Sequence, residues 1–199
     1  MSVPVIGVLA LQGDVREHSA VLERCGAQTR AVRRPSELDG LQGIVLPGGE
    51  STTMSKLAVA FEIFEPLRER LHEGLPALGT CAGMIMLADR ILDPRSGQQT
   101  FGGIDITVRR NAFGRQIDSF ESELEFANQA SGDTPLHAVF IRAPWVEEAG
   151  DSVDVLARVR TGPAAGRIVA VQQGHLMATS FHPEVTDDDR IHRAFLNLI

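Results

Sequence analysis

Three short apolar runs, each followed by a turn of small or polar residues, constrain the fold more than any other feature of this sequence. They cover residues 3–11, 43–46 and 75–79. Runs this short and this apolar are typical of strands buried on both faces, which occur in parallel sheets covered by helices. The first half of the chain therefore predicts an α/β sheet.

The spacing of apolar residues between and after these runs predicts the remaining elements. Helices are expected over residues 15–25, which Gly26 would end, 52–64 and 82–88, with a last helix from about Asp187. Further strands are expected at residues 28–32, 104–108, 122–126, 137–141, 153–159, 167–172 and 177–181. The 199 residues suit one domain: an open, mostly parallel, flavodoxin-like sheet with helices on both faces and added antiparallel strands.

Charge and hydropathy exclude several classes of function. The net charge of -7 would repel a phosphate backbone, so no nucleic-acid partner is expected. No run approaches the roughly 20 apolar residues of a membrane helix, and the N-terminus does not resemble a signal peptide. We therefore expect a cytoplasmic protein without membrane contact, whose two cysteines, Cys25 and Cys81, stay unpaired thiols. Cys25 falls on the apolar face of the first helix and is expected to be buried and inert.

Cys81 lies at the centre of the pattern G-T-C-A-G, residues 79–83. Small residues on both sides of a nucleophile permit the sharp strand-to-helix turn called a nucleophile elbow, which exposes the central side chain. The backbone N–H of Ala82 would then face a developing oxyanion. A buried structural cysteine between closely packed glycines is the alternative, and only a nearby base distinguishes the two.

His182, in the tripeptide His182-Pro183-Glu184, is the candidate base. Side chains two apart in an extended segment point to the same side, so Glu184 is expected to orient the His182 imidazole. A carboxylate that orients an imidazole, with that imidazole beside a thiol, forms a catalytic triad. Taken alone, the tripeptide is more typical of a turn that ends a strand, and only its combination with the elbow favours the catalytic interpretation.

The loop P-G-G-E-S-T, residues 47–52, follows another predicted strand. Its paired glycines can present backbone donors to an oxyanion or a carbonyl, and it lacks the spacing and the lysine of a phosphate-binding loop. In open α/β sheets, ligands bind beyond the carboxyl ends of the strands. We therefore expect Gln12, residues 48–51 and Cys81 to converge on one crevice.

Four arginines are candidates to bind a carboxylate, because the guanidinium group matches its two oxygens. They are Arg109, Arg110, Arg115 and Arg142; Arg142 lies in an apolar run and is expected to need a partner. The five other histidines, His18, His72, His137, His175 and His192, show no metal-ligand spacing. We predict neither a metal nor another cofactor.

G-T-C-A-G together with H-P-E resembles the class I, or triad, glutamine amidotransferases. Four longer motifs are similar to the glutaminase subunits of pyridoxal 5'-phosphate synthase: A-L-Q-G-D-V-R-E-H (10–18), L-P-G-G-E-S-T-T-M (46–54), R-N-A-F-G-R-Q (110–116) and F-I-R-A-P (140–144). The resemblance spans essentially residues 1–199. It implies an enzyme that hydrolyses L-glutamine to L-glutamate and ammonia. The ammonia would go to a barrel-shaped synthase subunit that makes pyridoxal 5'-phosphate, in vitamin B6 biosynthesis.

The resemblance also implies a role for individual residues. Cys81 corresponds to the nucleophile, His182 to the base and Glu184 to the residue that orients the base. The positions that correspond to glutamine binding are Gly49, Glu50, Ser51, Arg110, Ile141 and Arg142. The Gly48-Gly49 peptide would complete the oxyanion hole with Ala82, and Gln12 corresponds to a position near the synthase.

Two other functions are compatible with a reactive cysteine on this fold. One is a free-standing cysteine-dependent γ-glutamyl hydrolase, which would act on γ-glutamyl peptides without a partner. The other is a non-enzymatic protein whose cysteine senses oxidants, and the paired H-P-E argues against it.

Overall fold

A computed structural model describes residues 3–112, 119–127, 134–162 and 164–199 of the chain. Its main sheet has ten strands, in the order β2-β1-β3-β4-β12-β11-β9-β6-β5, with β10 paired to β11. A separate hairpin pairs β7 with β8. The bounds are β1 Val5–Leu9, β2 Gln28–Val32, β3 Gly43–Leu46, β4 Ala77–Thr80, β5 Ala88–Leu92, β6 Ile104–Arg109, β7 Ser119–Leu124, β8 Leu136–Ile141, β9 Trp145–Ala149, β10 Asp154–Arg158, β11 Ile168–Gln173 and β12 Leu176–Thr179.

Five neighbouring strands form the main parallel part of this sheet, and β5 and β6 form a further parallel pair at its other edge. The strands β2, β1, β3, β4 and β12 are neighbours in this order and all run in one direction. This is the strand order 2-1-3-4-5 of flavodoxin-like folds, whose ligands bind where the order reverses, between the first and third strands. The predicted α/β fold is confirmed, and β11, β9 and β10 supply the antiparallel extension.

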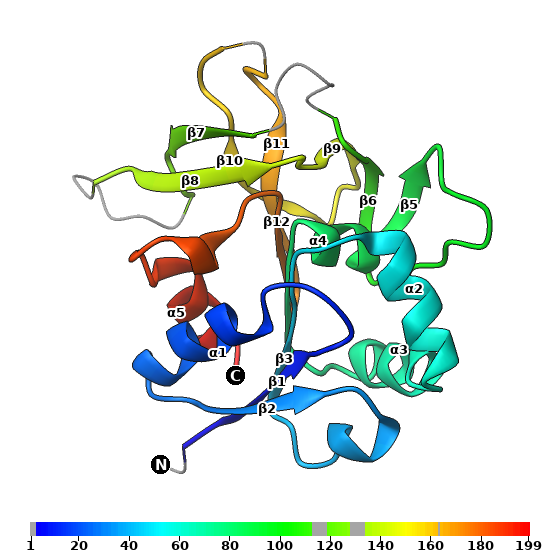
Figure 1. Cartoon of the computed structure of the whole chain (residues 1–199). Helices are drawn as coiled ribbons and strands as arrows, with labels where there is room; N and C mark the ends of the chain where they lie inside the picture. Colours follow the sequence, from blue (N-terminus) through cyan, green and yellow to red (C-terminus); the bar gives the residue numbers. More distant parts are fainter. Residues whose placement is uncertain (1–2, 113–118, 128–133, 163) are drawn as a thin grey trace.

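Helices cover both faces of the parallel strands (Figure 1). One face packs against α1 (Val15–Arg24) and α5 (Arg190–Leu196), and the other against α2 (Ser51–Ala60), α3 (Phe64–His72) and α4 (Ala82–Leu87). The strands are apolar throughout because successive side chains belong to opposite layers: Ile6 and Val8 join the first core, and Leu9 joins the second. Two short 3-10 turns, η1 (Pro35–Leu38) and η2 (Pro183–Val185), complete the described elements.

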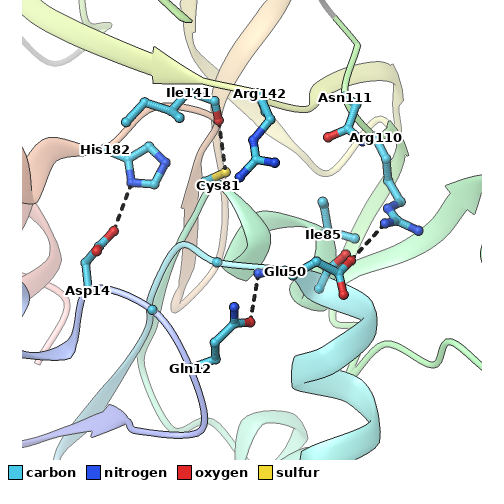
Figure 2. A pocket seen from close by; sticks show the side chains of 13 residues that line it. Gln12, Asp14, Glu50, Cys81, Ile85, Arg110, Asn111, Ile141, Arg142 and His182 are labelled. Carbon is cyan, nitrogen blue, oxygen red and sulfur yellow. Dashed lines mark hydrogen bonds and ion pairs between the residues drawn. The ribbon is translucent and has the colours of Figure 1, made fainter. Parts of the chain in front are cut away.

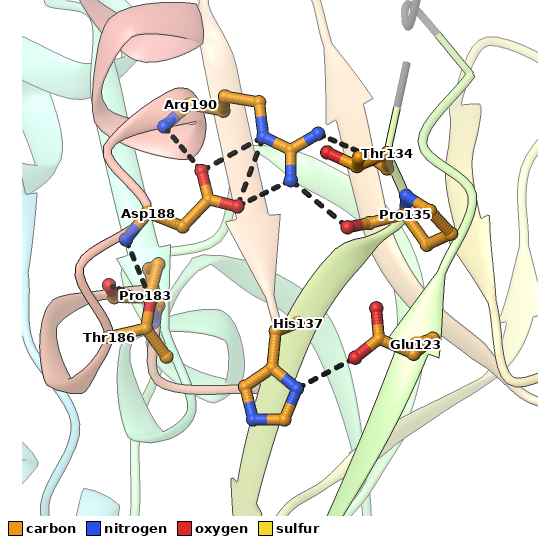
Figure 3. Close-up of polar contacts among 8 residues, drawn as sticks. All are labelled: Glu123, Thr134, Pro135, His137, Pro183, Thr186, Asp188 and Arg190. Carbon is orange, nitrogen blue, oxygen red and sulfur yellow. Dashed lines mark hydrogen bonds and ion pairs between the residues drawn. The ribbon is translucent and has the colours of Figure 1, made fainter. Parts of the chain in front are cut away.

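The β7–β8 hairpin is tied to the start of α5 by Arg190 (Figure 3). The guanidinium donates to the carbonyls of Thr134 and Pro135 at 2.7 and 3.1 Å, and it pairs with the Asp188 carboxylate. On the hairpin itself, His137 bonds Glu123 at 2.8 Å. These contacts hold β8, whose C-terminal end reaches the site described below.

Several local predictions were wrong. The helix expected over 52–64 is two helices, because the chain turns at Glu62 with φ +59°. The second helix, α3, has buried Phe64, Leu67 and Leu71 at helical spacing, a signal that the sequence contained. The strands β5 and β9 were not predicted either, since their exposed and buried residues do not alternate cleanly.

Cys25 also departs from expectation, because it is only partly buried. Its thiol lies 3.8 Å from the Asp189 carboxylate at the start of α5. Burial and this carboxylate raise the pKa of the Cys25 thiol, so it remains a poor nucleophile. Over the described ranges, none of the helices is long and apolar enough to cross a bilayer.

Candidate functional site

A pocket of about 290 Å³ opens at the carboxyl ends of β1, β3 and β4 (Figure 2). The loops after these strands, the end of β8 and the segment after β6 form its wall. The lining residues are Gln12, Gly13, Asp14, Gly49, Glu50, Ser51, Cys81, Ile85, Arg110, Asn111, Ile141, Arg142 and His182. The structure therefore brings together the segments that the sequence predicted to converge, and it adds Gly13, Asp14, Ile85 and Asn111.

Cys81 stands on a sharp turn between β4 and α4. Its backbone has φ +49° and ψ -102°, a conformation that non-glycine residues rarely adopt. The flanking glycines are required by close packing: a Cβ on Gly83 would lie 2.0 Å from the Leu46 carbonyl oxygen, and one on Gly79 would lie 2.5 Å from the Gly83 oxygen. This is the strained geometry of a nucleophile elbow.

His182 and Glu184 stand opposite the elbow, after β12. The His182 N–H donates to the Val139 carbonyl on β8 at 2.9 Å, and the imidazole Nδ1 lies 2.7 Å from Glu184 Oε1. The expected pairing of the two side chains is present, but its cause is different. Glu184 lies in the turn η2 rather than in extended chain, so the turn brings the carboxylate beside the ring.

The electrostatics of this pair favour a charged imidazole. Burial alone would lower the pKa of His182, but the contacts with Cys81 and Glu184 outweigh it and raise that pKa to about 10. Burial raises the pKa of Glu184, and the hydrogen bond to His182 opposes this shift. An imidazolium beside the thiol stabilises a thiolate, the reactive form of a cysteine.

Asp14 supplies a second carboxylate at the site, and no sequence pattern predicted it there. Its Oδ2 lies 3.5 Å from His182 Nδ1 (Figure 2), and it makes no capping bond to α1, although it occupies the position before that helix. The ligand-type atoms of Asp14, His182 and Glu184 lie within 4.8 Å of one another. Since Glu184 already holds His182 Nδ1, we assign the group to imidazole orientation rather than to metal binding.

The Gly48-Gly49 loop packs against both His182 and the loop after β1. A Cβ on Gly48 would lie 2.3 Å from the His182 ring, and Gly49 has φ +147°. Gln12 secures the loop, because its Oε1 accepts the Glu50 N–H at 2.9 Å. Only glycine fits at these two positions without moving the imidazole or straining the backbone.

Two backbone N–H groups at or beside the pocket have no protein acceptor among the residues that the structure describes. Across the described ranges, neither the Gly49 N–H nor the Ala82 N–H donates to a protein acceptor. Gly48 and Ala82 do not line the pocket themselves; Ala82 is the first residue of α4, directly after Cys81. Unpaired amides beside a nucleophile can stabilise a negative oxygen.

Glu50 and Arg110 form the far wall. The Glu50 carboxylate accepts the N–H groups of Thr52 and Thr53 at 3.1 and 2.8 Å, which caps α2, and it pairs with Arg110 at 3.1 Å. Burial would raise the pKa of Glu50, but the bonds to Thr53 and Thr52 lower it overall. Arg110 also donates to Gln98 at 2.7 Å, and Gln98 in turn donates to Ser51 at 3.0 Å.

The remaining predicted arginines differ in position. Arg142 is exposed at the pocket, with φ +43°, and no ion pair joins it to any residue that the structure describes. The expectation that it needs a partner was wrong, because the end of the apolar run turns outward. Arg109 pairs with Glu147 away from the pocket, and Arg115 lies outside the described residues. The Ile141 carbonyl lies 3.9 Å from the Cys81 sulfur.

Comparison with known proteins gives close matches over almost the whole chain. A subunit named "Pyridoxal 5'-phosphate synthase subunit PdxT" from Nocardioides sp. is 66% identical over 196 residues, which cover 98% of this chain and 96% of the relative. A protein of the same name from Kineococcus radiotolerans is 63% identical, with coverage of 98% and 95%. A crystal structure of a glutamine amidotransferase shares 47% identity and superposes with a TM-score of 0.87 over 97% of both chains.

These matches confirm the resemblance found in the sequence, to the triad amidotransferases and to the synthase subunits within them. The model of the SNO glutamine amidotransferase family matches residues 8–199. That span contains the elbow, the H-P-E turn and every residue of the pocket. The chain therefore belongs to the SNO glutamine amidotransferase family.

Proposed function

We propose that this chain hydrolyses L-glutamine to L-glutamate and ammonia with Cys81, His182 and Glu184 as its catalytic triad. One observation carries the assignment: a cysteine on a strained elbow and an imidazole bonded to a buried carboxylate face the same 290 Å³ pocket. The Glu184 carboxylate keeps Nδ1 protonated, so Nε2 is left to exchange a proton with the thiol.

The reaction proceeds through a thioester. The Cys81 thiolate forms a C–S bond to the side-chain amide carbon, and the C=O electrons move to oxygen. When they return, the C–N bond breaks and His182 gives its proton to the leaving nitrogen, which departs as ammonia. His182 then takes a proton from water, whose oxygen attacks the thioester; glutamate forms, and the thiolate leaves.

The pocket supplies groups of the types that glutamine requires. We assign the tetrahedral oxyanion to the free N–H groups of Gly49, in the Gly48-Gly49 peptide, and Ala82. The exposed guanidinium of Arg142 is available for the substrate carboxylate. The remaining glutamine-binding positions that we assign are Gly49, Glu50, Ser51, Arg110 and Ile141.

The relatives carry the name of a pyridoxal 5'-phosphate synthase subunit, and we extend this role to the present chain. Ammonia would pass to the barrel-shaped synthase subunit in a hetero-oligomer, and Gln12, exposed at the pocket, would lie near that contact. A cytoplasmic location suits a chain that depends on a free thiol. Ammonia reacts as the neutral amine, so transfer within a complex would limit its protonation by water.

Glutamate release from glutamine by Cys81→Ala and by Cys25→Ala, each alone and with the synthase subunit, tests the assignment. Cys25→Ala is the matched control, since it removes the other thiol from the far end of α1. We expect Cys81→Ala to abolish release with the fold intact, and Cys25→Ala to keep it. Release by Cys81→Ala would contradict the triad, and turnover of γ-glutamyl peptides without the synthase would favour the free-standing hydrolase.

A further inference from the structure

A second histidine pair is buried directly behind the triad. His18 on α1 and His192 on α5 are both 0% exposed, and His18 Nδ1 lies 2.9 Å from His192 Nε2. The other ring nitrogen of His18, Nε2, lies 3.1 Å from Thr80 Oγ1 and 3.4 Å from Glu184 Oε2. Thr80 immediately precedes the nucleophile Cys81, and Glu184 orients the base His182. His18 therefore lies beside residues next to both the nucleophile and the base.

Glu184 Oε2 needs such a neighbour. The other oxygen, Oε1, bonds His182, whereas Oε2 is buried and has no hydrogen bond of ordinary geometry among the described residues. His18 Nε2, at 3.4 Å, is the group placed to complete it. A buried carboxylate oxygen without a donor disfavours the ionised form that the triad requires.

The surroundings determine which nitrogen of His18 carries its proton. Burial, reinforced by His192 and His182, lowers the pKa of His18 well below its ordinary value, and burial with Arg24 lowers that of His192 to about 4. Both rings are therefore neutral near pH 7. A neutral imidazole donates from one nitrogen and accepts at the other. An ionised Glu184 can only accept and the Thr80 hydroxyl can also accept, so a hydrogen on His18 Nε2 suits both neighbours of that atom. His18 Nδ1 then accepts from His192 Nε2–H.

The surroundings of His192 agree with a hydrogen bond that His192 donates to His18. With its hydrogen on Nε2, His192 has an unprotonated Nδ1, and that atom is buried without a partner among the described residues. In this tautomer the buried atom without a partner is an acceptor nitrogen. In the other tautomer it would be an N–H donor without an acceptor. The charged groups that act on His192 are Arg24 and Asp189. On the other side, His182 acts on His18, and the Glu184 carboxylate lies 3.4 Å from it.

We propose that His18 is a positioning residue of the glutaminase triad, whose Nε2–H, placed between Thr80 Oγ1 at 3.1 Å and Glu184 Oε2 at 3.4 Å, favours an ionised Glu184 carboxylate oriented toward His182. This inference rests on the proposed function. His192 on α5 donates to His18 Nδ1 and so fixes the hydrogen of His18 on Nε2, the nitrogen that faces the active site. Neither ring touches the substrate pocket.

The test compares His18→Leu, which removes the donor, with His18→Gln, whose amide N–H can replace Nε2–H. The control is His175→Leu, because His175 is a partly buried histidine bonded to the Leu71 carbonyl, remote from the triad. With the synthase present, we expect His18→Leu to lower kcat about tenfold while KM stays unchanged, and His18→Gln to recover most of the loss. The control should match the wild type.

A second measurement separates positioning from simple support of the fold. The pH dependence of Cys81 alkylation, followed by mass spectrometry of its peptide, reports formation of the thiolate without any partner. In His18→Leu we expect this profile to move upward by about one pH unit, because a weaker Glu184 carboxylate stabilises the imidazolium less. A variant that melts earlier yet keeps the wild-type profile and kcat would overturn the proposal.

The wild-type chain supplies a test that no folding defect can obscure. Nitrogen-15 NMR of labelled histidines should show His18 as the neutral Nε2–H tautomer between pH 6 and 8, and a hydrogen on Nδ1 would overturn the proposal. The triad is judged separately by Cys81→Ala. Loss of activity there with a normal His18→Leu removes only the positioning role, whereas activity in Cys81→Ala removes the proposed function itself.

Discussion

Three non-glycine residues with positive φ line the pocket: Cys81 at +49°, Asn111 at +45° and Arg142 at +43°. Each such conformation costs roughly 1–3 kcal/mol, so it persists only where contacts in the surrounding structure offset that cost. At Cys81, the holding contacts are the Cys81 N–H bond to the Thr179 carbonyl at 2.8 Å and the close approach of Gly83 to β3. The strain is concentrated where side chains must point into the pocket rather than along an element.

Gly49→Val tests the oxyanion loop at the scale of one residue. Gly49 has φ +147°, and a Cβ there would lie 3.2 Å from Gln12 Oε1. A branched side chain would therefore strain the backbone and move the Gly49 N–H. We expect glutamate release in the complex to fall by about 10²-fold or more, as for loss of one oxyanion donor.

The control for that variant is Gly74→Val. Gly74 also has a positive φ, +108°, but a Cβ there meets nothing within 4 Å, so it introduces backbone strain away from the pocket. Gly74→Val should lose some stability and retain its turnover per folded molecule. Equal turnover in the two variants would remove the Gly49 amide from the mechanism.

At the scale of elements, the elbow depends on how closely α4 approaches β3. The limiting contact joins Gly83 to the Leu46 carbonyl, and both partners are backbone, so neither can rotate away. A larger residue at position 83 must move the whole helix, and Cys81 moves with it. The catalytic geometry is therefore coupled to helix–sheet packing.

We expect Gly83→Ala to lower the free energy of unfolding by about 1–3 kcal/mol, the usual effect of overpacking, and to reduce glutaminase turnover. Chemical denaturation and glutamate release measure the two effects. Gly7→Ala is the control: its Cβ would meet the Leu41 side chain at 2.7 Å, and a flexible side chain can move. If both substitutions destabilise the chain equally, backbone contact is not what limits position 83.

At the scale of the whole molecule, two histidines that are neutral and buried in the native state predict an acid limit to stability. The native pKa of His192 is about 4, below the ordinary 6.5, and that of His18 is lowered too. As the pH falls below 6.5, the unfolded chain binds protons that the native chain resists. The stability that depends on these two neutral rings is therefore fully present above pH 6.5 and is lost progressively as the pH falls toward 4.

Thermal unfolding between pH 7.5 and 4.5 measures this loss. His192→Gln should be less stable than the wild type near pH 7 but should lose less stability on acidification, since one buried titrating group is gone. His175→Gln, remote from the pair, should keep the wild-type slope. Identical pH slopes for the wild type and His192→Gln would assign the acid limit to other groups.

Most of what could be predicted from the sequence depends on residues close to one another in the chain. The strands over 28–32 and 43–46 were placed with their observed bounds, and the elbow around Cys81 was recognised, because short apolar runs and glycine turns depend on neighbours in the chain. The break at Glu62 was missed because a non-glycine residue there takes the left-handed conformation that ends the helix, with the Glu62 and Ile63 N–H groups bonded back to Val59 and Ala58. The edge strand β5 was missed because its pairing with β6 is a tertiary contact.

The contacts in the site also fall into two groups, those predicted from the sequence and those that only the tertiary structure decides. The pairing of His182 with Glu184 was predicted from their separation of two residues, although the turn η2 and not an extended segment produces it. The resemblance of the motifs named the residues that meet in the pocket. The sequence contained no signal that Asp14 faces His182, or that His18 reaches His192 across 174 residues of chain. Only the packing of α1 and α5 on one face of the sheet decided those contacts, because hydrogen bonds between distant segments depend on tertiary distances that no local pattern encodes.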